Sequence, residues 1–143
     1  MIAELPAAGR PGAPRVLILY NEPVLPADHP DAASEYEVLD TVGTVQQALA
    51  GAGCAVSRLG VSRDPAPLVA VLRDDRPDAV FNLFEGLADF GNTEAHVAGL
   101  LEWFGVPFTG SPYQTLSLAR SKHITKHLLQ GAGLPTPGFF VVD

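Results

Sequence analysis

The sequence predicts an α/β protein with a Rossmann-like, three-layer parallel sheet, in which helices cover both faces. Two observations lead to this prediction. Short continuous apolar runs, of which residues 16–20 (VLILY) are the first, recur along the chain, and such runs are typical of strands buried on both faces. Segments with helical periodicity separate these runs, and this alternation is typical of βαβ units joined into a parallel sheet.

Composition is consistent with one domain and excludes several classes of function. The chain has 143 residues, of which 47% are hydrophobic and 17% charged, enough to bury a core. The formal net charge of −7 argues against a nucleic acid or an anionic membrane surface as partner. No signal-like segment and no apolar run of roughly 18 residues is present, so we expect a cytoplasmic protein. Cys54 is the single cysteine, which excludes an internal disulfide and a cysteine metal cluster.

The first half of the chain predicts a leader, a strand, a loop and a helix. Residues 1–14 are rich in Ala, Gly and Pro, and we interpret them as a flexible leader. The strand at 16–20 is followed by a Pro-rich loop at 21–33, long enough to be functional. A helix is expected after Ser34, because apolar residues recur at helical spacing and two glycines end the pattern at Gly51 and Gly53.

The second half continues the alternation of strands and helices. The expected elements are a strand at 54–61, a short helix at 65–73, a strand at 79–84, a helix at 92–104, a short strand at 107–109, a helix from Ser111, a helix at 122–130 and a strand at 138–142. Asn92 and Ser111 are the expected caps of their helices. We expect residues 15–121 to form the Rossmann-like domain, and residues 122–143 to contribute a helix and the first strand of a following, truncated domain.

Two carboxylates stand at positions where they could bind a ligand, one after a strand and one at the start of a helix. Glu85 directly follows the strand at 79–84, beside Gly86, and Glu35 stands at the start of the first helix. Ligands bind at the carboxyl ends of parallel strands, and a glycine lets a ligand approach the backbone. Alternatively, Glu35 has only a structural role, in which its negative charge in the first turn stabilises the helix by interacting with the helix dipole. Glu85 would then be an ordinary loop residue.

Three segments resemble D-alanine–D-alanine ligase-type ATP-grasp enzymes. Residues 100–142 (LLEWFGVPFTGSPYQTLSLARSKHITKHLLQGAGLPTPGFFVV) are similar to the family's run of Gly-x-Pro-aromatic-x-Gly-Ser, a lysine, and Leu-Leu-x-x-x-Gly-Leu-Pro-x-Pro. Residues 16–21 together with 34–38 (SEYEV) resemble the segment that carries a glutamate at the first helix. Residues 82–86 (NLFEG) lie where the ligases have Leu-His-Gly. By this resemblance the chain is identified as an N-terminal, pre-ATP-grasp domain.

The resemblance implies a carboxylate–amine ligase that uses ATP and Mg²⁺ in peptidoglycan synthesis, through an acyl-phosphate intermediate. It implies that Glu35, with Glu85 and Gly86, binds the amino-acid substrate, that Lys122 approaches ATP, and that the protein forms a homodimer. In the family, the Mg²⁺ ligands and most ATP contacts belong to later domains. We therefore expect no catalytic or metal residue in this segment, which would be inactive alone. Glu85 stands in place of the family's histidine, so the amino acid or amine that is ligated stays open.

Several alternatives to this interpretation stay open as well. The chain could act as a stand-alone, non-catalytic amino-acid-binding or interaction module of the same fold. Lys122 could be an ordinary surface lysine, and Lys126, one helical turn later, is expected to be solvated. His123 and His127 have the spacing of a helical metal pair, but no third ligand with recognisable spacing accompanies them.

Overall fold

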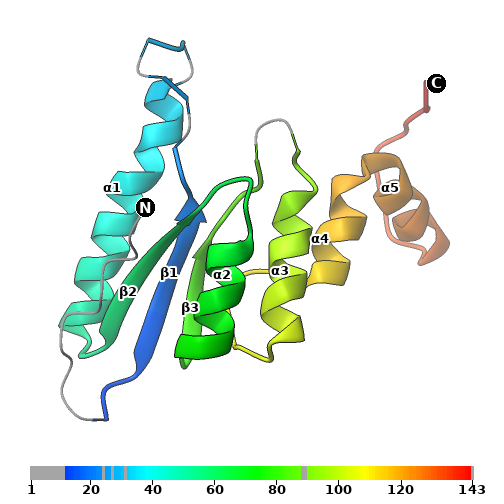
Figure 1. Ribbon diagram of the computed structural model, residues 1–143. Helices are drawn as coiled ribbons and strands as arrows, with labels where there is room; N and C mark the ends of the chain where they lie inside the picture. Colours follow the sequence, from blue (N-terminus) through cyan, green and yellow to red (C-terminus); the bar gives the residue numbers. More distant parts are fainter. Residues whose placement is uncertain (1–11, 24, 27, 31, 88–89, 143) are drawn as a thin grey trace.

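Three parallel strands form the centre of the molecule. The computed structural model describes residues 12–23, 25–26, 28–30, 32–87 and 90–142, so most of the predicted leader lies outside the described residues. Strand β1 (Arg15–Asn21) lies between β2 (Ala55–Val61) and β3 (Ala79–Leu83), which gives the order β2-β1-β3 (Figure 1). The apolar runs at 16–20, 54–61 and 79–84 are thus confirmed as strands, with ends shifted by one residue.

The register of the sheet is fixed at the amino ends of the strands. Val16 pairs with Val56 of β2 and with Ala79 of β3. The Arg15 amide donates to an Asp78 carboxylate oxygen at 2.7 Å, and the Asp78 amide donates to the Arg15 carbonyl oxygen at 2.8 Å. The Arg15 guanidinium also donates to the Arg76 carbonyl oxygen. A slip of one residue would turn the apolar side chains to the wrong faces, so these contacts help to hold a register that buries the core.

Helices cover both faces of the sheet, which confirms the predicted three-layer arrangement (Figure 1). Helix α1 (Ala32–Gly51) packs on one face, where Val42 is 1% exposed and other members of its apolar stripe lie beside it. Helices α2 (Ala66–Ala70) and α3 (Thr93–Trp103) pack on the opposite face. The predicted helix at 65–73 is interrupted, because residues 71–75 form a π-helical turn, η1 (Val71–Asp75).

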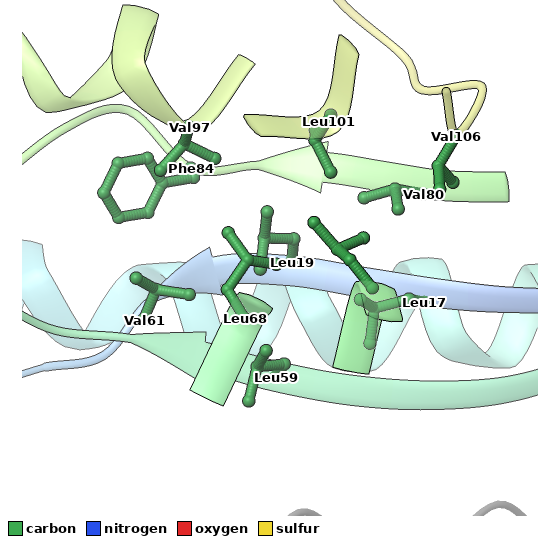
Figure 2. Close-up of a cluster of buried hydrophobic side chains, with 11 residues drawn as sticks. Leu17, Leu19, Leu59, Val61, Leu68, Val80, Phe84, Val97, Leu101 and Val106 are labelled. Carbon is green, nitrogen blue, oxygen red and sulfur yellow. The ribbon is translucent and has the colours of Figure 1, made fainter. Parts of the chain in front are cut away.

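The larger part of the core fills the space between the sheet and helices α2 and α3. Alternation along β1 sends Leu17 and Leu19 to this side, whereas Ile18 faces α1. Leu68 and Leu101 anchor α2 and α3, and both are fully buried. Figure 2 shows this cluster, in which apolar side chains from three strands meet those of the two helices.

Two predicted strands differ from the structure. Residues 107–109 form one parallel bridge, between Phe108 and Val80, rather than a full fourth strand. Residues 138–142 form no strand, and Phe140 is 87% exposed. The prediction at 138–142 was wrong because a strand needs a hydrogen-bonding neighbour, and within the described residues none lies beside this segment. The division of the chain at residue 121 stays a prediction.

Two helix starts are also capped differently from the prediction. Helix α4 (Tyr113–Arg120) begins two residues after Ser111, and no side chain at its N-cap position, Pro112, forms a cap. Instead, the Glu102 carboxylate accepts a hydrogen bond from the Tyr113 amide at 2.9 Å, because α3 ends beside the start of α4. Asn92 makes no capping bond either. After a break at Ser121, α5 (Lys122–Gly131) follows as predicted. No helix in the described ranges is long and apolar enough to cross a membrane.

Candidate functional site

A cleft of about 830 Å³ lies at the carboxyl ends of the strands. All three strand arrows in Figure 1 point toward this end of the sheet, where the loops after β1 and β3 lie. The cleft is lined by residues from the end of β1 and its loop, the first turns of α1, the segment directly after β2, and the end of β3 with the loop that follows it. Crossover connections leave a crevice at this end of an open parallel sheet, so the cleft follows from the topology.

The three residues predicted to bind substrate all line this cleft. Glu35 reaches it from α1, whereas Glu85 and Gly86 reach it from the loop after β3, fifty residues further along the chain. The structure therefore brings together a residue that the sequence placed at a helix start and two that it placed after a strand. They line one cleft, and their role as ligand-binding residues stays a prediction.

Glu35 holds the loop that follows β1. The side chain is half-buried in the first turn of α1, and one carboxylate oxygen accepts a hydrogen bond from the Leu25 amide at 2.7 Å. Leu25 itself lines the cleft. The carboxylate is thus held at the wall of the cleft by a backbone donor, in the first helical turn, where the helix dipole stabilises negative charge.

Asn21 holds the opposite wall, and the sequence analysis did not identify it. Its side-chain amide donates to the Gly86 carbonyl oxygen at 2.6 Å, while its side-chain oxygen accepts from the Glu85 amide at 2.8 Å. One side chain at the end of β1 therefore satisfies two backbone groups of the loop after β3. The signal that could have identified this position is a polar amide directly after a buried apolar run.

Replacing Asn21 by aspartate should loosen this wall while preserving the side chain's shape. A carboxylate still accepts from the Glu85 amide, but its second oxygen faces the Gly86 carbonyl and lacks a proton to donate. We expect the free energy of unfolding, measured by urea denaturation, to fall by about 1–3 kcal/mol, the range for a half-buried acceptor that loses its donor.

Asn92→Asp is the matched control, because Asn92 is exposed and makes no capping bond at the start of α3. It should not lower stability, since a negative charge is favourable near a helix N-terminus. Equal stability of Asn21→Asp and the unchanged chain would contradict the bridging role of Asn21.

Charge in the cleft is mainly negative. Among the described residues that line it, four are glutamates and one, Arg63, carries a positive charge. The glutamates are Glu22, Glu35, Glu37 and Glu85. A concave surface lined mainly by one sign of charge concentrates ligands of the opposite sign. The cleft is therefore suited to a ligand that carries an ammonium group, and Arg63, which the sequence analysis did not identify, is a cation at the same surface.

Comparison with known proteins gives one consistent answer. No family model matches the chain. The D-alanine–D-alanine ligase of Rhizobium meliloti is 38% identical over 112 residues, which cover 78% of this chain and 34% of the relative. The enzyme of the same name from Pseudomonas entomophila is 36% identical over 124 residues, or 86% of this chain and 34% of the relative. That of Sinorhizobium fredii is 40% identical over 96 residues, or 67% and 29%.

This chain is homologous to part of the D-alanine–D-alanine ligases. The resemblance inferred from its motifs is confirmed, because the aligned residues span most of the described fold. The chain spans about a third of the length of the D-alanine–D-alanine ligases that it matches.

The lysine that the D-alanine–D-alanine ligase resemblance assigns to ATP lies away from the cleft. Lys122 is the first residue of α5, it is exposed, and it is not among the residues that line the cleft. The structure thus does not bring Lys122 together with Glu35 and Glu85, and its contact with ATP stays a prediction.

Lys126 was expected to be solvated, but the structure shows that it is partly shielded from water. It is half-buried, and its ammonium donates to the Pro137 carbonyl oxygen at 3.0 Å while lying 5.2 Å from the centre of the Phe139 ring. The expectation was wrong because the chain after α5 folds back along the helix, so that a backbone acceptor and an aromatic face replace water around the ammonium.

The described residues do not form a site for a divalent metal. No group of three or more His, Cys, Asp or Glu side chains among them is arranged to hold a metal ion.

Proposed function

We propose that this chain is the N-terminal domain that binds the first amino-acid substrate of an ATP-dependent carboxylate–amine ligase of the D-alanine–D-alanine ligase type. One observation carries the proposal: Glu35, Glu85 and Gly86 line a single cleft in a chain whose relatives are named D-alanine–D-alanine ligases. The proposed compartment is the cytoplasm, which supplies ATP.

In this proposal, the cleft holds the substrate by its ammonium group. A carboxylate offers about four lone-pair positions, and in the proposed complex Glu35 accepts a hydrogen bond from the substrate ammonium while still accepting that of the Leu25 amide. Glu85 faces the same space from the other side, and the positive φ of Gly86, +96°, turns the backbone of that wall. Hydrogen bonds between ionised partners are about twice as strong as neutral ones, which favours an amino acid over an uncharged molecule.

ATP and Mg²⁺ are the cofactors of the proposed ligase, and ATP supplies the energy for activating a carboxylate. The described residues do not fit Mg²⁺, because they contain no suitable cluster of oxygen ligands. No step of phosphoryl transfer is therefore assigned to them. Their proposed contribution is to bind and orient one substrate, which lowers the entropic barrier to reaction with a second.

Titration calorimetry with D-alanine as the probe tests the site. We expect D-alanine to bind and propionate, which lacks the amino group, to bind far more weakly. Glu35→Gln and Glu85→Gln should each weaken D-alanine binding about tenfold, which corresponds to about 1.4 kcal/mol. Glutamine keeps an oxygen acceptor for the Leu25 amide, so the Glu35 variant removes charge without releasing the loop.

Asp40→Asn serves as the control for charge alone, because Asp40 lies on the same helix as Glu35, is exposed, and does not line the cleft. It should bind D-alanine as the unchanged chain does. If both glutamate variants bind as tightly as the unchanged chain, the cleft is not the substrate site.

A second candidate function is amino-acid binding without catalysis. It is favoured by one observation, that four glutamates line the cleft, because binding an ammonium group requires no further chemistry. Phosphate release that depends on Mg²⁺-ATP, measured on the full-length product of the natural gene, separates the two functions. Release that increases with added amino acid supports the ligase, whereas D-alanine binding without release supports the binding module.

A further inference from the structure

Arg120 joins the loop of the cleft to a part of the chain that does not line it. It is the last residue of α4, and its guanidinium lies 3.2 Å from a carboxylate oxygen of Glu94 in the first turn of α3. The exposed fractions of the two side chains are 37% and 27%, so both are partly shielded from water. This ion pair connects the end of α4 to the start of the helix that follows the cleft loop.

The same guanidinium lies against the backbone of Gly91. A Cβ atom added to Gly91 would overlap a terminal nitrogen of Arg120. Gly91 does not have a positive φ, so its backbone does not require glycine. Because Gly91 has no side chain, the Arg120 guanidinium has room to pack against its backbone.

Gly91 in turn packs against Gly86, which lines the cleft. A Cβ atom on Gly86 would lie 2.9 Å from the Gly91 carbonyl oxygen, so the two ends of the loop are in direct backbone contact. Inside the loop, the Thr93 hydroxyl accepts from the Leu87 amide at 2.8 Å and donates to the Phe90 carbonyl oxygen at 2.7 Å. A continuous series of contacts therefore runs from Arg120 through Gly91 to Gly86.

We propose that Arg120 is a positioning residue, which holds the loop of Glu85 and Gly86 against the cleft from outside by pairing with Glu94 and packing on Gly91. The proposal rests on the proposed function of that cleft. Arg120 precedes Lys122 by two residues, so the same contact fixes the start of α5 relative to the substrate loop.

Amide hydrogen exchange of the 143-residue chain, measured by NMR without ligand, tests this positioning. In Arg120→Ala, the Leu87 and Phe90 amides, which form hydrogen bonds within the loop, should exchange roughly threefold to tenfold faster. This range reflects the modest strength of a partly exposed ion pair. The Leu19 amide in the sheet should exchange as before, which a general loss of stability would not allow.

Three further variants make the test specific. Arg120→Lys should restore part of the protection, because an ammonium is able to pair with Glu94. Gly91→Ala should displace the guanidinium and resemble Arg120→Ala. Glu94→Gln combined with Arg120→Ala should add little to either single change, since both remove the same contact.

Unchanged exchange of the Leu87 and Phe90 amides in Arg120→Ala would overturn the proposal. The same holds if the Leu19 amide accelerates by an equal factor, because the effect would then be global. Failure of the proposed function is separate from both outcomes: the unchanged chain would not bind D-alanine, while its loop exchange would still depend on Arg120.

Discussion

Replacing Gly86 by alanine is expected to lower the free energy of unfolding by about 2–3 kcal/mol and to abolish D-alanine binding. Two physical effects add here. The φ of Gly86 is +96°, a region in which a side chain costs about 1–3 kcal/mol. The added Cβ would also lie 2.9 Å from the Gly91 carbonyl oxygen, a backbone atom that cannot rotate away. The loop has to move to relieve this contact, and Glu85 moves with it.

Gly110→Ala separates these two effects. Gly110 has a similar φ, +107°, but an added Cβ would meet nothing within 4 Å. Urea denaturation of both variants should show the larger loss of stability for Gly86→Ala, and the difference measures the contact with Gly91. Equal losses would mean that the close approach of the two glycines is unimportant. The Gly110 variant should bind D-alanine normally, because Gly110 does not line the cleft.

Replacing Leu101 by alanine should lower the free energy of unfolding by about 3 kcal/mol. Leu101 is fully buried between α3 and the sheet, in the cluster that also contains Val80 and Val97 (Figure 2). Truncation of a buried leucine removes apolar contacts and leaves a cavity, and the measured range for such changes is about 2–5 kcal/mol. The central value is expected because rigid strands and helices surround the site and limit its collapse.

Leu128→Ala is the control for this change in the same residue type. Leu128 is 51% exposed on α5, so its truncation should change stability by about 0.5 kcal/mol or less. Both variants are compared by urea denaturation at the same pH and salt concentration. If Leu101→Ala loses no more stability than Leu128→Ala, α3 does not depend on this cluster for its position.

The strands of the sheet were predicted well because each is marked by a local pattern rich in apolar residues. A continuous apolar run such as 16–20 is compatible with few other structures, and the glycines at 51 and 53 mark the end of the first helix plainly. The failures concern partners distant in sequence. Ser111 was expected to be a cap, but the Tyr113 amide bonds to Glu102 of the preceding helix. The run at 138–142 has a strand pattern, but none of the described residues pairs with it.

For the candidate site, the sequence predicted which residues would line the cleft, but it did not predict the contacts that hold them in place. Glu85 was found from the rule that parallel strands gather ligands at their carboxyl ends, whereas Glu35 was found from its place in the segment that resembles the ligase family. Asn21 bonds to residues more than sixty positions away, and Arg120 meets Glu94 across a helix boundary. Such contacts depend on how elements pack, and a single sequence does not encode that packing in any local pattern.

The contacts of Arg15 with residues 75–78 affect which changes of sequence this fold can tolerate. Alignment of the strands is secured at the end of the sheet opposite the cleft, so it does not depend on which side chains occupy the binding loops. Changes at positions such as Glu85 are therefore expected to leave the sheet intact, and under the proposed function they would alter which ligand the cleft binds. Point mutations in the cleft should therefore be able to change ligand specificity without loss of the fold, because different residues determine the strand register and line the cleft.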